Sequence, residues 1–124
     1  MDSICIVIRK APYGSLSAAE GVRHLVGAAA GGMQVTAVLV DDGVYVAKHG
    51  HDPDDTGWTS LSVILQQALA QAAASGSPRI YVYVHRPSAQ QRGLGSVDFV
   101  SGVELVDDSQ VTAALAGAEG LLVF

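Results

Sequence analysis

The segment IYVYVHRPSAQQRGL, residues 80–94, is the stretch from which the fold can be assigned. Its first part, Ile80 to Val84, is an unbroken run of β-branched and aromatic residues, typical of a strand that is covered on both faces. At His85 the run changes to a polar segment that contains two arginines, a proline and a glycine. The change predicts that a strand ends at His85, and that this residue stands at the mouth of a site or interface.

Four further apolar runs predict strands, at Ile4–Ile8, Val35–Val40, Val103–Val106 and Leu121–Phe124. Helical periodicity covers residues 16–30, 60–74 and 109–118, and the polar piece Ser88–Arg92 suits a single helical turn. Ser17 and Glu20 have the spacing of a capping box. Val44–Val46 fits either a short strand or a helical turn. Alternating strands and helices predict an α/β domain with a mainly parallel sheet between two layers of helices.

Polar loops follow three of the predicted strands. They are Arg9–Gly14, Asp41–Gly43 and His85–Pro87. Because function in parallel sheets concentrates at the carboxyl ends of the strands, we expect these loops to share a site or interface. The candidate ligand or interface residues are Arg9, Tyr13, Asp41, Asp42, His85, Arg86 and Arg92. Asp41-Asp42-Gly43 is interpreted as a turn in which the glycine takes a positive φ.

The composition restricts the class of protein. The 124 residues fit a single domain over 1–124, and 49% hydrophobic against 15% charged residues suggests apolar surface hidden in an oligomer. A net charge of −5 without a basic cluster disfavours direct binding to nucleic acid. No apolar run approaches the roughly 20 residues of a membrane span, and the N-terminus does not read as a signal peptide, so the cytoplasm is the expected location. No cofactor is predicted.

At this point a resemblance covers nearly the whole chain. The ordered features are a first strand followed by Ala-Pro-Tyr-Gly, a second followed by Asp-Asp-Gly-Val, a third leading into HRPSAQQRGL, and a closing GLLVF. In this order they resemble the DsrE/DsrF-like sulfur-relay family, and most closely its DsrF/TusC branch. The resemblance implies a three-layer α/β/α fold with a mainly parallel five-stranded sheet, and homo-oligomers or hetero-oligomers of related subunits. It also implies a small sulfur-carrier protein as a further partner and a role in tRNA thiolation or sulfur oxidation.

The resemblance also identifies one departure. Sulfur-carrying members hold a cysteine at a strand end, seven residues before the arginine of an Arg-Gly pair. Here the pair is Arg92-Gly93, and the seventh residue before Arg92 is His85. Persulfide relay requires a thiolate. The one cysteine, Cys5, lies within an apolar run and is expected to be an inert core residue. We therefore expect a non-catalytic or accessory subunit.

Two other functions remain open from the residues alone. A stand-alone homo-oligomer would bind a small anionic ligand or nucleotide at the strand-end cleft, through Arg9, Lys10, Arg86 and Arg92. An enzyme would use His85 as a general base or metal ligand, with Ser88 as its nucleophile. Separately, His49 and His51, followed by Asp52, Asp54 and Asp55, form a weak candidate set of metal ligands in a segment with ordinary loop composition. Trp58 is expected to anchor that loop.

Overall fold

The computed structural model describes residues 2–13, 15–50, 60–74 and 79–124. Its strands are β1 (Ser3–Ile8), β2 (Gln34–Leu39), β3 (Ile80–His85), β4 (Val103–Val106) and β5 (Gly120–Val123). Its helices are α1 (Ser17–Ala30), α2 (Leu61–Ala74), α3 (Arg86–Gln91) and α4 (Asp108–Gly117). Two 3-10 segments, η1 (Asp41–Ala47) and η3 (Ser96–Asp98), complete the described elements.

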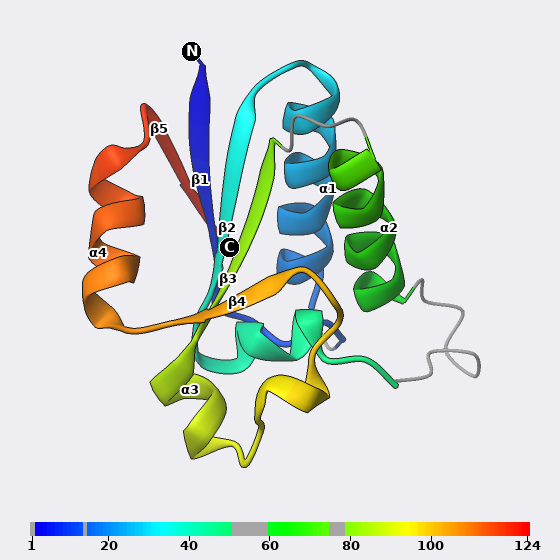
Figure 1. The fold of residues 1–124 in the computed structure, drawn as a ribbon, viewed down its shortest axis with the longest axis vertical. Coiled ribbons are helices and arrows are strands. Elements are labelled where there is room, and N and C mark those ends of the chain that lie inside the picture. The colour runs from blue at the N-terminus through cyan, green and yellow to red at the C-terminus, as the bar shows by residue number, and fades with distance from the viewer. Residues whose placement is uncertain (1, 14, 51–59, 75–78) are drawn as a thin grey trace.

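The strands form one five-stranded sheet in the order β4-β3-β2-β1-β5. All four strand pairs are parallel, and in the central pair Ile6 lies opposite Ala37. Helices α1 and α2 cover one face of the sheet and α4 the other (Figure 1). The prediction of a three-layer domain with a mainly parallel five-stranded sheet is confirmed.

The core is unequal on the two faces of the sheet. On the side of α1 and α2, Ile6, Leu39 and Val84 are buried together with side chains from both helices. On the side of α4, the buried cluster consists of Cys5, Val7 and Val38, against which Val111 and Leu115 of α4 pack. Among the described helices, α4 alone covers the second face, and the edge strand β5 keeps exposed apolar side chains there.

The start of α1 differs from the prediction. Ser17 is the first residue of α1 rather than its cap, and Leu16 occupies the capping position without a side-chain bond. The capping box predicted from Ser17 and Glu20 is therefore wrong. The Glu20 carboxylate instead accepts a hydrogen bond of 2.5 Å from Arg23, one helical turn further on. A capping box does occur at α4, where Asp107 and Gln110 satisfy each other's backbone amides.

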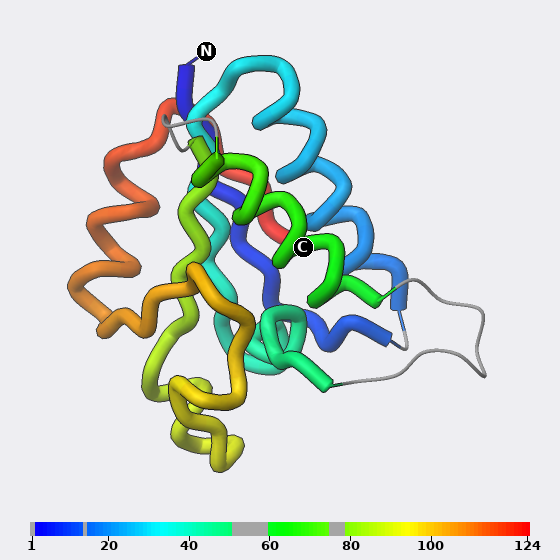
Figure 2. Tube along the Cα trace, turned by 45° about the vertical axis from the view of Figure 1, so that its right-hand side comes forward, coloured from blue at the N-terminus to red at the C-terminus, as the bar shows by residue number. Residues whose placement is uncertain are grey.

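The carboxyl ends of the strands carry two short helical segments. Val44–Val46, for which a strand and a helical turn were both open, lies in the 3-10 segment η1, and the expected turn at Ser88–Arg92 is the six-residue helix α3. η1 and α3 contact each other. Figure 2 shows both segments at the lower end of the sheet, where β2 and β3 end. Among the described residues, no helix has the length and apolar character needed to cross a bilayer.

Candidate functional site

The candidate site lies where β2 and β3 end. β2 is followed through Val40 by Asp41, the first residue of η1. β3 runs directly into α3, with His85 as the last strand residue and the capping residue of the helix. Pro87 fits the first turn of α3, because the amide groups there have no partner within the helix. The local sequence thus places His85 at a sharp boundary between strand and helix.

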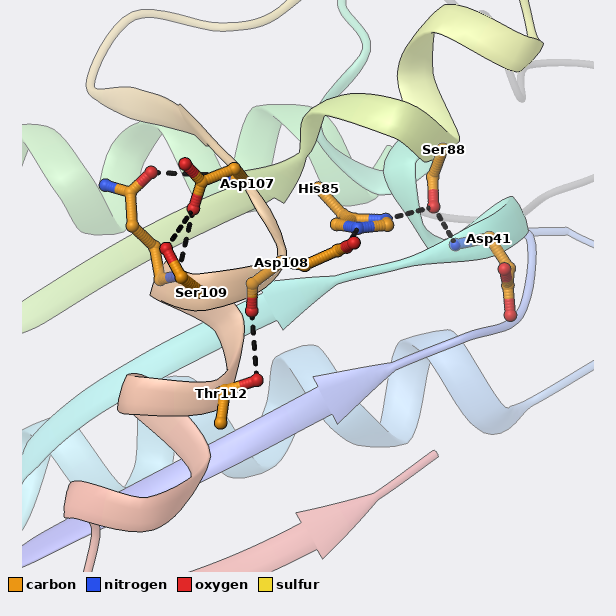
Figure 3. Close-up of polar contacts among 8 residues, drawn as sticks. Asp41, His85, Ser88, Asp107, Asp108, Ser109 and Thr112 are labelled. Atoms are coloured by element: carbon orange, nitrogen blue, oxygen red, sulfur yellow. Dashed lines mark hydrogen bonds and ion pairs between the residues drawn. The ribbon is translucent and has the colours of Figure 1, made fainter.

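His85 is held on both sides of its ring (Figure 3). Its Nδ1 lies 2.7 Å from Oγ of Ser88, which is one turn further along α3. Its Nε2 lies 2.5 Å from Oδ1 of Asp108, in the first turn of α4. The imidazole therefore connects the end of β3 to the beginning of α4, across 23 residues of sequence.

Ser88 joins the Asp41 backbone to the His85 ring. The backbone N–H of Asp41 donates to Oγ of Ser88 at 2.9 Å, so the hydroxyl hydrogen of Ser88 is available for His85. In the tautomer with the ring proton on Nε2, the His85 ring accepts that hydrogen at Nδ1 and donates to Asp108 from Nε2. Every donor in the chain of contacts has an acceptor in this arrangement.

Asp41 has a special backbone conformation. Its φ of 51° is the one positive value among the described residues other than glycine. The turn prediction placed the positive φ at Gly43, and that assignment is wrong. Gly43 is required for a different reason, because a Cβ there would lie 1.9 Å from the backbone oxygen of Ile8. The side chain of Ser88 helps to hold the uncommon geometry of Asp41 by accepting its N–H.

The arginines at this edge already have partners. Arg92 donates from Nε to Asp42 at 3.0 Å and from Nη1 to the backbone oxygen of Ser88 at 3.0 Å. Arg9 lies 4.0 Å from the Asp41 carboxylate. Arg86 donates to the backbone oxygen of Leu105 at 3.3 Å. An anion entering this edge would have to displace Asp42 from Arg92, so the contacts favour positioning of the loops over capture of a ligand.

The cluster contains the residue types of a hydrolytic triad, but not its geometry. In the familiar arrangement the serine lies on Nε2 and the acid on Nδ1, whereas here the two partners are exchanged. The Ser88 side chain is also buried, with 4% of the residue exposed, and it accepts from Asp41. These contacts suit a structural link between elements better than an accessible nucleophile.

Asp108 is the residue of this cluster that sequence reasoning missed. It lies in the second half of an acidic pair, Asp107-Asp108, at the start of a helix. Acidic residues are common in that position because they complement the helix dipole, so the pair by itself indicates only a helix start. Its contact with His85 follows from the path of the chain between β4 and α4.

The remaining predicted residues lie apart from the His85 cluster. Tyr13 lines a hollow of about 330 Å³ together with Pro12, Tyr45 and Lys48, and no residue of the cluster lines it. His49 contacts the backbone oxygen of Val97 at 2.8 Å. The other members of the weak metal set, from His51 to Asp55, and Trp58 lie outside the described residues. Among the residues that the structure does describe, no group of three or more His, Cys, Asp or Glu side chains could hold a metal ion.

Cys5 lies in the core, as predicted. It is 0% exposed in β1, on the side of the sheet that α4 covers, with Val7 and Val38 as its neighbours in that cluster. Burial in these surroundings raises the pKa of its thiol, because the thiolate would lose its hydration. The thiol is therefore kept protonated and away from the edge at which His85 stands.

Known proteins match this chain in both sequence and fold. The model of the DsrE/DsrF-like family matches residues 2–124. The chain is 31% identical over 125 residues to the TusC homolog of Vibrio vulnificus strain CMCP6, with full coverage of both proteins. It is 27% identical over 130 residues to the intracellular sulfur oxidation protein DsrF of Allochromatium vinosum, covering 94% of this chain and 91% of that protein. The crystal structure of the YchN protein from E. coli superimposes with a TM-score of 0.81 at 23% identity over the whole of both chains.

Proposed function

The chain belongs to the DsrE/DsrF-like family, and on that premise we propose that it is an accessory, non-catalytic member of a sulfur-relay assembly. It acts as one domain over residues 1–124 and works through contacts with other subunits, either copies of itself or related DsrE/DsrF-like chains. A small sulfur-carrier protein is the further partner, and the cytoplasm is the site of action. The named relatives, a TusC homolog and a DsrF, support a place in the DsrF/TusC branch.

The proposal rests on one observation, which is the absence of a usable thiol. A carrier holds sulfane sulfur as Cys-S-S⁻, which forms when a thiolate attacks a persulfide and displaces the donor thiol. The residue at the end of β3 is His85, and an imidazole does not form that exchangeable bond. Cys5, the one cysteine of the chain, is fully buried and its pKa is raised. Sulfur transfer through this subunit therefore needs a cysteine from another chain.

The hydrogen bonds around His85 support a role in fixing the shape of the edge at which β2 and β3 end. His85, Ser88 and the Asp41 amide hold the ends of β2 and β3 together, and Asp108 adds the start of α4. The Asp42–Arg92 pair adds a further link between η1 and the end of α3. An edge fixed in this way presents a constant surface to a neighbouring subunit, which is what an accessory subunit requires.

Mass spectrometry after incubation with glutathione persulfide tests the absence of a carrier thiol. The native protein is expected to keep its mass, whereas His85→Cys gains about 32 Da, the mass of one sulfur atom. The matched control is His85→Cys with Cys5→Ala, which should gain the same mass because Cys5 takes no part. An adduct on the native protein that disappears in Cys5→Ala would refute the proposal.

Co-purification tests the assembly. The tagged native protein is expressed with a cysteine-bearing DsrE/DsrF-like chain, and we expect the two to elute together and the partner to accept sulfur in the complex. If the two chains form a complex but the partner accepts sulfur equally well when this chain is left out, the accessory role is contradicted. A protein that binds neither related chains nor itself would contradict the role through subunit contacts.

A further inference from the structure

The edge strand β5 is open on its outer side. The sheet order puts β4 and β5 at the two edges. β4 carries the charged side chain of Glu104, and Arg86 donates to the Leu105 carbonyl of that strand. β5 reads GLLV, with neither a charge nor a proline. Charged side chains and prolines on edge strands keep them from pairing with other chains. By this criterion β4 is protected and β5 is not.

The backbone of β5 directs two residues outward. Phe124, just after the strand, donates to the Val7 carbonyl at 2.8 Å and accepts from the Arg9 amide at 2.7 Å, so its N–H and C=O face β1. Hydrogen-bonding direction alternates along a strand, so Leu122 also faces β1, and Leu121 and Val123 face away from it. Within the described part of the chain, these outward groups have no partner.

The same two residues expose their side chains. Leu121 is 51% and Val123 is 56% exposed, on the sheet face that α4 covers only in part. They lie two residues apart on one strand and so form a small continuous apolar strip. A strip of apolar side chains next to unpaired backbone groups is what an incoming β-strand would cover.

The opposite face of β5 has a hollow beside Leu122. This hollow has a volume of about 350 Å³ and is lined by Leu122 and Ile4 of the sheet and by residues of α1, among them Arg23, His24 and Gly27. It arises because α1 packs over β1 and β2 and leaves the α1 side of β5 incompletely covered. An apolar side chain from a strand paired with β5 would enter it.

We propose that β5 pairs with β5 of a second copy of this chain, antiparallel, to form one continuous sheet across a two-fold axis at Leu122. The outward amides determine this register. Leu121 exchanges both hydrogen bonds with Val123 of the second copy, and Val123 does so with its Leu121. Leu122 then stands opposite its own counterpart, whose side chain enters the hollow beside α1. Leu121 and Val123 of both copies close one apolar strip.

A second copy is the occupant because the strand is self-complementary. Pairing in this register places apolar residues opposite apolar residues on both faces and leaves no charge buried, since β5 contains none. The interface is isologous and closes as a dimer instead of propagating. The pairing rests on the strand edge alone, and neither His85 nor sulfur chemistry enters it. It names one surface for the subunit contacts of the proposed function, and the tests below can refute this surface while binding of related chains and the absence of a carrier thiol are left standing.

Engineered cysteines test the register. At Leu122 the two Cα atoms would be about 4.5 Å apart, within the range of a disulfide, whereas two copies of residue 121 would be diagonal neighbours about 7–8 Å apart. Leu122→Cys is expected to form a cross-linked dimer under mild oxidation of the native protein, and Leu121→Cys, its control, to remain uncross-linked. Native Cys5 is fully buried and does not interfere. Equal cross-linking of both variants, or of neither, would overturn the register.

Sedimentation velocity tests the interface without depending on the disulfide. The native protein is expected to sediment at no less than twice the 12.7 kDa of one chain. Leu121→Lys places a charge in the strip and should halve that mass, while its circular dichroism stays native because the site is exposed. The control is Val63→Lys on α2, where the valine is 48% exposed, and it should sediment like the native protein. A native monomer, or a Leu121→Lys protein of native mass, would refute the pairing.

Discussion

Replacing Ser88 by alanine probes whether the strand-end cluster is a structural link. The substitution removes the acceptor of the Asp41 N–H and the hydrogen-bond partner of Nδ1 of His85. Each such bond contributes about 0.5–1.5 kcal/mol, and the Asp41 amide is left in a part-buried place without its acceptor. We expect the free energy of unfolding to fall by about 2 kcal/mol, which corresponds to about 8 °C in Tm for a chain of this length.

Urea denaturation followed by circular dichroism measures this difference directly. The slope of the unfolding free energy against urea should not change, because the surface exposed on unfolding is nearly the same. Ser101→Ala is the matched control. Ser101 is exposed in the turn before β4, its hydroxyl has no partner among the described residues, and the change should stay within about 0.5 kcal/mol. If Ser88→Ala also stays within that limit, the hydroxyl does not hold the site together.

A double-mutant cycle separates the two bonds of Ser88. His85→Ala and Ser88→Ala are measured singly and together, and their coupling free energy should be about 1 kcal/mol if the Nδ1–Oγ bond forms in solution. Coupling near zero would mean that Ser88 acts through Asp41 alone.

Three further predictions concern other parts of the fold. Gly43→Ala should lower the free energy of unfolding by about 4 kcal/mol or prevent folding, because the added Cβ meets the backbone of Ile8. Gly27→Ala in α1 should raise it by about 0.5–1 kcal/mol, because a Cβ there has nothing within 4 Å and alanine favours the helix. Urea titration of the two variants and the native protein measures both changes. Backbone and side-chain hydrogen bonds lower the pKa of Asp107 below 3.8, so its stabilising cap is present at neutral pH and is lost as pH falls through the lowered value; thermal unfolding of Asp107→Ala should therefore differ from the native protein at pH 7 and converge with it in acid. Cys5 should react with iodoacetamide only after unfolding, as followed by mass spectrometry, and rapid alkylation of the native protein would contradict its burial.

Much of the fold could be predicted because its signals are local. The run from Ile80 to Val84 is apolar at every position and predicted a strand covered on both faces. The strand is confirmed as β3, but it buries Ile80, Val82 and Val84 on one face and leaves Tyr81 on the other face exposed. The stripe of α2, with Leu61 and Leu65 buried, likewise follows from helical spacing. The cap of α1 was predicted wrongly because Ser17 and Glu20 have the right spacing but lie one position too far into the helix, and Glu20 pairs with Arg23.

The amino-acid sequence by itself determined the class of fold, the polar strand ends and the absence of a thiol where β3 ends, because these depend on residue identity and short spacing. Only the tertiary structure decided that Asp108 meets His85, that Asp42 meets Arg92, and that Leu121 and Val123 face outward from an open edge. The physical reason is the parallel sheet, whose strand order and register bring together residues 23 or 50 positions apart. No local pattern encodes which ends become neighbours or which strand is left at the edge.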